Sequence, residues 1–124
     1  LSWKYIIGAI SAAAVAVAPV TDWRYYDAIY TERFMLTPNE NEAGYKQASC
    51  LTHIANRCCP LLIMSGTADD NVHMANTIQY VSEMQSQGTW CDLLLFPNKN
   101  HSINGCNARS LVYARMLEYF NKNM

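Results

Sequence analysis

The sequence has little charge and almost no imbalance of it. Nine Lys and Arg stand against ten Asp and Glu, which gives a net charge of −1, and charged residues make up 15% of the 124 residues. A nucleic-acid binder would carry a basic surface, so this balance argues against one. Hydrophobic residues reach 51%, which excludes a disordered chain. The low charge and the start at Leu1 favour a piece of a larger protein whose apolar faces are covered.

The sequence also lacks a complete disulfide framework, because its five cysteines are an odd number. A single disulfide stays open. Four zinc-type ligands lie within ten residues, at Cys50, His53, Cys58 and Cys59. Structural zinc sites use separated pairs, and the side chains of adjacent cysteines point apart. We therefore expect no metal and no cofactor.

The apolar run at 6–20 allows two interpretations. With Lys4 before it and small residues at alternate positions near its end, it resembles the core of a signal peptide followed by a cleavage site. It is too short to span a bilayer, which needs about 20 residues. Its end, a β-branched run closed by Pro19 and Val20, is typical of a buried strand in a parallel sheet. We favour the strand.

Apolar runs alternate with helical patterns along the rest of the chain. We expect strands at 15–20, 61–64 and 93–96, helices at 23–30, 49–55, from 71 to Gly88 and at 107–121, and a surface excursion at 37–49. This order predicts an α/β fold, with a parallel sheet of buried strands covered by helices on both faces. Three such strands leave at least one edge unpaired.

The helical periodicity predicts which side chains face inward. In the helix that follows the second strand, the expected inner stripe is Val72, Ala75, Ile78 and Val81. In the last helix, Val112, Met116 and Phe120 share one face, with Tyr113 and Leu117 beside it. Near the first strand, Asp22 can cap a helix in which Trp23, Tyr26 and Tyr30 share a face.

Two loops carry titratable groups after neighbouring strands. Asp69 follows the second strand and His101 follows the third. The carboxyl ends of parallel strands meet at one edge of a sheet, where functional loops gather. An Asp–His hydrogen bond is therefore within reach, in the order of the end of a Ser…Asp…His triad. The alternative is that Asp69 and Asp70 cap a helix and His101 is a solvated loop residue.

Three motifs favour the catalytic interpretation. The string Gly-Thr-Ala-Asp-Asp-Asn-Val-His occupies 66–73, Val-Ala-Pro-Val occupies 17–20, and Tyr-Asp…Tyr-Thr-Glu-Arg-Phe-Met occupies 26–35. Together these strings resemble the dipeptidyl peptidase IV branch of the prolyl oligopeptidase family, proline-directed serine exopeptidases, and the likeness is to bacterial members. It runs from about Val15 to Phe120 and implies an α/β-hydrolase fold.

The resemblance assigns roles to individual residues. Asp69, and not Asp70, would be the triad acid that orients the imidazole, and His101 would be the general base and later the acid. Asn71 matches the position whose amide binds a substrate carbonyl. The apolar pocket that accepts the penultimate proline would consist of Tyr26, Tyr30, Val20 and Trp23. Aromatic faces suit a rigid pyrrolidine ring that has no N–H.

The sequence departs from the family pattern in three places. Ser65 stands where many members have His, and Ser102 follows His101 where Gly is common; neither side chain is catalytic in the family. The third departure is an absence, since no Gly-x-Ser-x-Gly string for the nucleophile occurs in the chain. The string Trp-Lys-Tyr at 3–5 lacks the flanking glycines and is not a mutated nucleophile turn.

We therefore expect residues 1–124 to be the last part of a peptidase catalytic domain, without the nucleophile turn and the β-propeller. The resemblance implies release of N-terminal X-Pro or X-Ala dipeptides through an acyl-enzyme, export from the cytoplasm, and a homodimer of the parent protein. Its partners would be peptide substrates and the rest of the parent polypeptide. Two alternatives are a non-catalytic truncated homologue and an endopeptidase or acylaminoacyl-peptidase; Tyr26 and Tyr30 argue against the latter.

Overall fold

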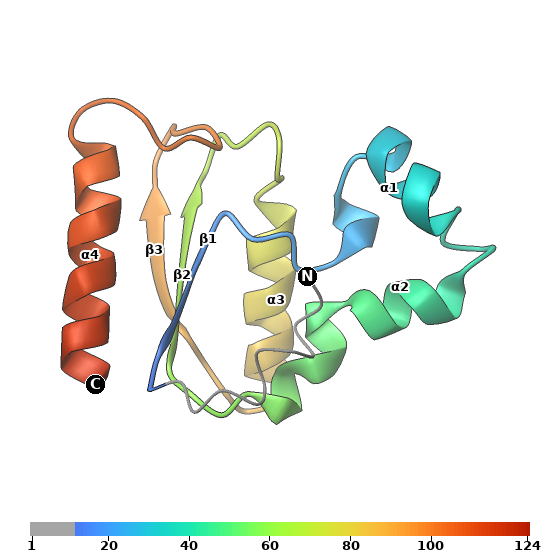
Figure 1. The fold of residues 1–124 in the computed structure, drawn as a ribbon, viewed down its shortest axis with the longest axis horizontal. Helices are drawn as coiled ribbons and strands as arrows, with labels where there is room; N and C mark the ends of the chain where they lie inside the picture. Colours follow the sequence, from blue (N-terminus) through green and yellow to red (C-terminus); the bar gives the residue numbers. More distant parts are fainter. Residues whose placement is uncertain (1–11) are drawn as a thin grey trace.

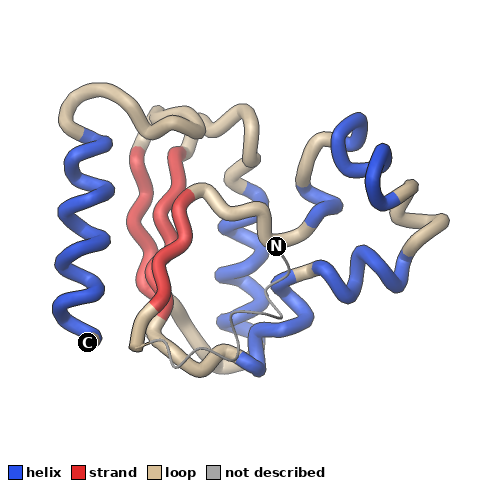
Figure 2. The backbone as a smooth tube through the Cα atoms, viewed as in Figure 1, coloured by secondary structure: helices blue, strands red, loops and turns tan. Residues whose placement is uncertain are grey.

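Three short apolar runs form a parallel sheet. The computed structural model describes residues 12–124, and in them the strands are β1 (Ala14–Val17), β2 (Leu61–Gly66) and β3 (Asp92–Phe96), in the order β1-β2-β3 (Figures 1 and 2). All strands are parallel, so their carboxyl ends, with the loops that follow β2 and β3, lie at the same edge of the sheet. The predicted fold class is confirmed.

Burial separates the central strand from the outer two. Every residue of β2 is buried, as its continuous apolar run predicts. Within residues 12–124, β1 and β3 each pair on one side only, and Val17 and Leu93 are both 39% exposed. The prediction of buried strands is therefore right for β2 and wrong for β1 and β3. Hydrophobic composition cannot report which strand lies at an edge.

Helices cover both faces of the sheet, as predicted. Side chains alternate along β2, so Leu62 and Met64 face α4 (Ala108–Asn123), while Leu61 and Ile63 face α3 (Ala75–Ser86) (Figure 1). The α4 side of the core is completed by Phe96, Ile103, Ala108, Val112 and Tyr119, and the α3 side by Ile54, Tyr80 and Met84.

The predicted helix at 23–30 is wrong in its extent, because two aspartates cap two separate helices. Asp22 accepts a hydrogen bond from Arg24 N (2.8 Å) and begins η2 (Trp23–Tyr25), a single 3₁₀ turn. Tyr26 is extended. Asp27 then accepts from the backbone of Ile29 and Tyr30 and begins α1 (Ala28–Met35).

Two further boundaries differ from the prediction. The first strand ends at Val17 and not at Val20, since Ala18 has a φ of 46° and turns the chain out of the sheet. The expected surface excursion contains α2 (Glu42–Ala48), which Asn41 caps and Tyr45 anchors. Tyr45 is 1% exposed and donates its hydroxyl to the Leu36 carbonyl. The next helix, η3 (Cys50–Asn56), is 3₁₀ and agrees with the short helix expected at 49–55.

The inner face of α3 is not the predicted apolar stripe. The helix begins at Ala75, and its buried residues are Asn76, Thr77, Tyr80 and Met84, whereas Ile78 is 47% exposed. Two of the buried residues are polar, and both have partners: Thr77 Oγ1 lies 2.7 Å from Ser65 Oγ, and Asn76 is described below. Hydrogen bonds to distant segments stabilise these two polar side chains in the interior. The periodicity of apolar residues along the helix does not reveal such partners.

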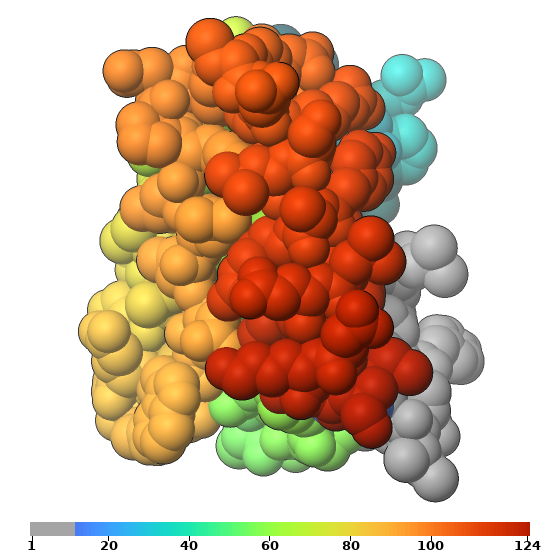
Figure 3. All heavy atoms as spheres, turned by 90° about the vertical axis from the view of Figure 1, so that its left-hand side faces the viewer, coloured from blue at the N-terminus to red at the C-terminus, as the bar shows by residue number. Residues whose placement is uncertain are grey.

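The last helix, α4, lies across one side of the molecule (Figure 3). Val112 is buried as expected, while Tyr113 and Leu117 are 57% and 65% exposed. No helix within residues 12–124 is both long enough and apolar enough to cross a membrane. The alternative of a signal peptide concerns 6–20, of which 6–11 lie outside the described part, and the string at 3–5 lies wholly outside it.

Candidate active site

The loops after β2 and β3 are joined by backbone hydrogen bonds. Thr67 N donates to the Phe96 carbonyl (3.0 Å) and Ala68 N donates to the Lys99 carbonyl (3.0 Å). In the other direction, Asn98 N donates to Thr67 Oγ1 (2.9 Å). Each loop thus satisfies polar backbone groups of the other, which fixes the distance between them.

Gly66 allows this close approach. A Cβ atom at this position would lie within 3 Å of the Lys99 carbonyl oxygen and 2.8 Å from that of Asn100. Both contacts are with backbone, which cannot rotate away as a long side chain can. A glycine at the end of a strand is a known sign of close backbone approach.

The Asp69 carboxylate connects the two loops. Its Oδ1 accepts hydrogen bonds from the backbone N–H of Asn71 (3.0 Å) and Val72 (2.8 Å). Its Oδ2 lies 2.8 Å from Nδ1 of His101. The side chain of Asp69 is 1% exposed, so both oxygens are shielded from water. This carboxylate is held in one orientation with one oxygen toward the imidazole.

The contact with Asp69 determines which nitrogen of His101 carries the proton. A carboxylate only accepts hydrogen bonds, so the neutral ring must donate from Nδ1. Nε2 then holds the lone pair, and it makes no hydrogen bond to any residue of 12–124. The His101 side chain is 41% exposed. The ring can therefore accept a proton at Nε2 from a group outside this pair.

Asp70 and Asn71 follow the acid and are exposed. The hydrogen bond and ion pair of the His101 ring are with Asp69 and not with Asp70. Asn71 Oδ1 accepts a hydrogen bond from the Tyr26 hydroxyl (3.0 Å). With Oδ1 so engaged, Nδ2 of Asn71 is available to donate.

An aromatic cluster lies beside this loop and continues onto α1. Tyr26 stands edge-on to Trp23 and to Tyr30, at centroid distances of 5.8 and 5.5 Å, and Trp23 stacks with Tyr30 at 6.4 Å. The predicted association of these three rings is found, although no single helix creates it. Val20 is half-buried in the segment before η2. Tyr30 is 51% exposed, so the cluster offers an open aromatic face.

The sequence interpretation missed two residues that hold this region together. Gly66 carried a usable signal, since it is the glycine that ends a buried strand. Asn76 carried none, because the helical periodicity placed other positions inward. Its amide contacts the segment that contains Trp23 and Tyr26.

Cysteine-rich segments lie elsewhere. A hollow of about 350 Å³ at the opposite edge of the sheet, where β2 and β3 begin, is lined by Arg57, Cys58, Cys59, Pro60, Leu61, Trp90, Cys91, Asp92 and Tyr119. Burial raises the pKa of the Cys59 and Cys91 thiols, so both stay protonated at neutral pH. No group of three or more His, Cys, Asp or Glu side chains in residues 12–124 is arranged to hold a metal ion.

The chain has a parallel sheet with helices on both faces, an acid after one strand and a histidine after the next. This is the arrangement of the α/β-hydrolase fold. The sequence model of the prolyl oligopeptidase family matches residues 9–124, and the chain belongs to that family.

Individual relatives of known name or structure support the same family. The chain is 46% identical over 108 residues to "Probable dipeptidyl-aminopeptidase B" of Paracoccidioides brasiliensis (strain Pb18), a match that covers 85% of this chain and 12% of that protein. The protein of the same name from Pyrenophora tritici-repentis (strain Pt-1C-BFP) is 48% identical over 105 residues, 82% of this chain and 12% of that protein. The crystal structure of Porphyromonas gingivalis dipeptidyl peptidase 4 superimposes with a TM-score of 0.87 at 45% identity, covering 91% of this chain and 16% of that one. The chain thus spans about one-eighth of the length of its curated relatives.

Proposed function

We propose that this chain supplies the acid and the base of a serine exopeptidase that releases N-terminal dipeptides ending in Pro or Ala. The observation that carries the proposal is the 2.8 Å contact between Asp69 Oδ2 and His101 Nδ1. The two backbone N–H groups both bond to Oδ1, so the buried Oδ2 has the imidazole as its partner and holds the ring in one orientation. A partly exposed imidazole with a free Nε2 is what a general base requires.

In this mechanism, His101 Nε2 takes the proton of a serine hydroxyl as the serine oxygen attacks the substrate carbonyl. The imidazolium then protonates the departing amine, which leaves an acyl-enzyme. A water molecule then attacks the acyl-enzyme, with His101 again as base and then as acid, and the dipeptide is released. Asp69 stays ionised throughout and stabilises the imidazolium from the Nδ1 side.

Substrate selection would rest on the aromatic cluster and Asn71. Trp23, Tyr26 and Tyr30 would contact the proline ring before the scissile bond, because aromatic faces match its flat apolar surface. Asn71 Nδ2 would donate to a carbonyl of the bound dipeptide. The hydrogen bond from Tyr26 to Asn71 supports this assignment, since it joins the two contacts in one unit.

The nucleophile must come from outside these residues, because the 124 residues contain no Gly-x-Ser-x-Gly string. Within residues 12–124, β1 pairs with β2 alone. We place the strand that precedes the serine beside β1, on the side away from β2. The carboxyl end of that strand, and the nucleophile after it, would then lie at the same end of the sheet as His101. The rest of the parent polypeptide is thus a required partner. Export and a homodimeric parent belong to the same proposal.

A chimera tests this function. Residues 12–124 replace the matching segment of the Porphyromonas gingivalis dipeptidyl peptidase 4, and hydrolysis of Gly-Pro-p-nitroanilide is measured. We expect the chimera to cleave the substrate. His101→Ala should lower kcat by about 10⁶-fold, as for other triad histidines. His53→Ala is the matched control: this histidine lies on η3, bonded to the Gln47 carbonyl, and its loss should leave kcat within about twofold.

A folded chimera without activity, or a fully active His101→Ala variant, would contradict the proposal. The first result would favour the alternative of a non-catalytic homologue that retains only the scaffold.

A further inference from the structure

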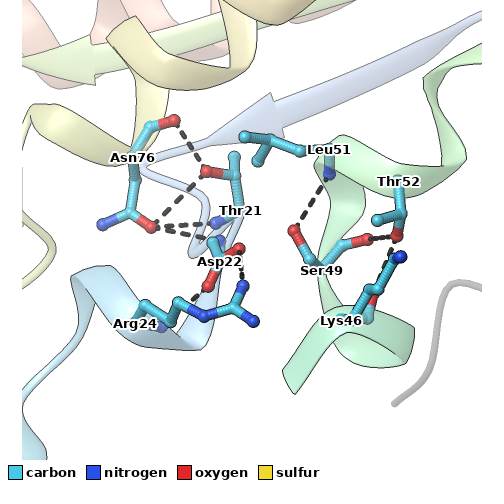
Figure 4. A network of polar contacts seen from close by, with 8 residues as sticks. All are labelled: Thr21, Asp22, Arg24, Lys46, Ser49, Leu51, Thr52 and Asn76. Atoms are coloured by element: carbon cyan, nitrogen blue, oxygen red, sulfur yellow. Dashed lines mark hydrogen bonds and ion pairs between the residues drawn. The ribbon is translucent and has the colours of Figure 1, made fainter. Parts of the chain in front are cut away.

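Asn76 is fully buried in the first turn of α3 (Figure 4). A primary amide has two acceptor sites and two donor hydrogens. Burying it without partners would cost several kcal/mol relative to water. Asn76 can therefore be buried only because backbone groups around it satisfy its amide. The segments to which these groups belong are the ones that Asn76 holds together.

One side of Asn76 contacts the segment 21–26, which we call the pocket loop because it contains Trp23 and Tyr26. Oδ1 accepts from the backbone N–H of Thr21 (3.0 Å) and Asp22 (3.4 Å). Nδ2 donates to the Tyr25 carbonyl (3.2 Å). Thr21 Oγ1 adds two contacts, since it lies 2.6 Å from the Asn76 backbone carbonyl, to which it donates, and 3.5 Å from Oδ1.

The other side of Asn76 contacts the end of the loop that begins at Asp69. Nδ2 donates to the His73 carbonyl (3.2 Å) and the backbone N–H donates to the same oxygen (2.9 Å). Three residues before His73 lies Asp70, and Asn71 and Val72 hold the acid by their backbone. One side chain thus connects the pocket loop with the loop that begins at Asp69, which we call the acid loop. Asn76 is 55 positions from Thr21 in the sequence and 3 positions from His73.

The remaining polar contacts of the pocket loop lead away from the acid. Cys50 N donates to the Thr21 carbonyl (2.8 Å), and the Arg24 guanidinium lies over the Tyr45 ring. These contacts attach the loop to α2 and η3. Toward the acid loop, the hydrogen bonds of the pocket loop among residues 12–124 are those with Asn76 and the exposed one from Tyr26 to Asn71.

We infer that Asn76 is a positioning residue that sets the proline pocket relative to Asn71 and His101. The inference rests on the proposed function and deepens it. Asn76 touches no substrate; it acts through the backbone of Thr21, Asp22 and Tyr25. Without its amide, the pocket loop keeps its attachment to α2 and η3. Toward the acid loop it keeps the Thr21 hydroxyl bond to the Asn76 backbone carbonyl and the exposed bond from Tyr26 to Asn71, so its distance to that loop is held less firmly. A ring bound by Trp23 and Tyr26 would then meet the catalytic pair in the wrong place.

The test uses the chimera defined above and four variants. Asn76→Ala removes all side-chain contacts of the amide. Thr21→Val removes only the hydroxyl that donates to the Asn76 carbonyl, and Thr21→Ser retains it. Thr77→Val is the matched control: Thr77 is the next residue of the same helix, is equally buried, and bonds to Ser65 under the sheet instead of to the pocket loop.

Two readouts separate positioning from stability. The first is the ratio of kcat/KM for Gly-Pro and Gly-Ala p-nitroanilides. We expect Asn76→Ala to lower this ratio about tenfold, chiefly through KM for the Pro substrate, and Thr21→Val to lower it about threefold. Thr21→Ser and Thr77→Val should stay within about twofold, although Thr77→Val lowers the unfolding midpoint. The second readout is amide hydrogen exchange, which should accelerate in 21–26 and not in 61–66.

An unchanged ratio with unchanged exchange in Asn76→Ala overturns the inference. If Asn76→Ala does not fold, equal ratios for Thr21→Val and Thr21→Ser overturn it. If the unsubstituted chimera is inactive, the proposed function fails, and if it does not distinguish Pro from Ala, the proposed proline pocket fails. In both cases the exchange of 21–26 still decides whether Asn76 positions the pocket loop.

Discussion

The hydroxyl of Tyr26 donates to Oδ1 of Asn71 over 3.0 Å and joins the aromatic cluster to the loop of the acid. An amide whose oxygen is engaged in this way presents its NH₂ group in a fixed direction. Tyr26 therefore has two tasks in the proposed function: its ring contributes to the proline pocket, and its hydroxyl orients the donor that meets a substrate carbonyl.

Removing this hydroxyl should weaken substrate binding without affecting chemistry. In the chimera, we expect Tyr26→Phe to raise KM for Gly-Pro-p-nitroanilide about fivefold, the value of one hydrogen bond of about 1 kcal/mol, with kcat nearly unchanged. Asn71→Ala should raise KM as well. In the double variant the two effects should not add, because Tyr26 acts through the Asn71 amide that the second substitution removes. Additive effects in this cycle would show that Tyr26 does not act through Asn71.

Replacing the acid by its amide should invert the tautomer of the histidine. The oxygen of an Asp69→Asn side chain would stay with the backbone N–H groups of Asn71 and Val72, so its NH₂ group would face His101 Nδ1. The ring would then carry its proton on Nε2, where it cannot act as a base. We expect kcat to fall about 10⁴-fold at neutral pH. Asp70→Asn, the adjacent control, should leave kcat within about twofold; comparable losses in both variants would contradict the assignment of Asp69.

Shortening Tyr30 should change specificity. Tyr30→Ala removes an aromatic face that a proline ring reaches and an alanine methyl does not. We expect kcat/KM to fall about 10–200-fold more for Gly-Pro than for Gly-Ala p-nitroanilide. The control is Tyr113→Ala on α4, a tyrosine of similar exposure (57% against 51%). Equal losses on both substrates in Tyr30→Ala would count against the proline pocket.

A methyl group at Gly66 should separate the two loops. The added Cβ meets the backbone carbonyls of Lys99 and Asn100, so the loop that carries His101 must move. We expect Gly66→Ala to cost about 1–3 kcal/mol in the free energy of unfolding, measured by urea denaturation, and to lower kcat. Gly88→Ala adds a methyl group where no atom lies within 4 Å, at a φ of +70°. Gly88→Ala should cost about 1–2 kcal/mol in the free energy of unfolding and leave kcat unchanged. A normal kcat in Gly66→Ala would show that this glycine does not set the distance between the loops.

A buried tyrosine should make the fold sensitive to alkali. Burial raises the pKa of Tyr80 from 10.0 to about 12. Between these values the folded protein keeps a proton that the unfolded chain has lost, so its stability is complete below pH 10 and declines as pH rises toward 12. Tyr80→Phe should reduce this decline by an amount of the order of 1–3 kcal/mol. Urea denaturation at pH 8 and pH 11 measures it, and parallel curves for both proteins would contradict the prediction.

The parts of the fold that depend on local sequence were predictable. The continuous run at 61–64 identified the central strand, and the spacing of Asp69 and His101 across one helix and one strand identified a pair that meets at one edge of the sheet. Whether an apolar strand lies at the centre or the edge depends on segments far away, so the exposure of Val17 was not predictable.

Burial of polar side chains was also beyond local sequence. Asn76 and Thr77 lie inside because Thr21, Tyr25 and Ser65 approach them from other segments, and no periodicity of α3 encodes those partners. The aromatic cluster is a mixed case. The spacing of Tyr26 and Tyr30 predicts one helix with a shared face. The rings do lie together, but a 3₁₀ turn, an extended residue and a separate helix place them there.

The Asp69–His101 contact spans 32 residues, all within the unit formed by β2, α3, β3 and the loop after it. Contacts of short sequence separation form early in folding, because little loop entropy is lost in closing them. The acid and the base can therefore assemble while the strand with the nucleophile is still unpaired. In the proposed function, the imidazole would then be oriented before the serine reaches it, and proteolytic activity would wait for the pairing of β1 with the strand that precedes the serine.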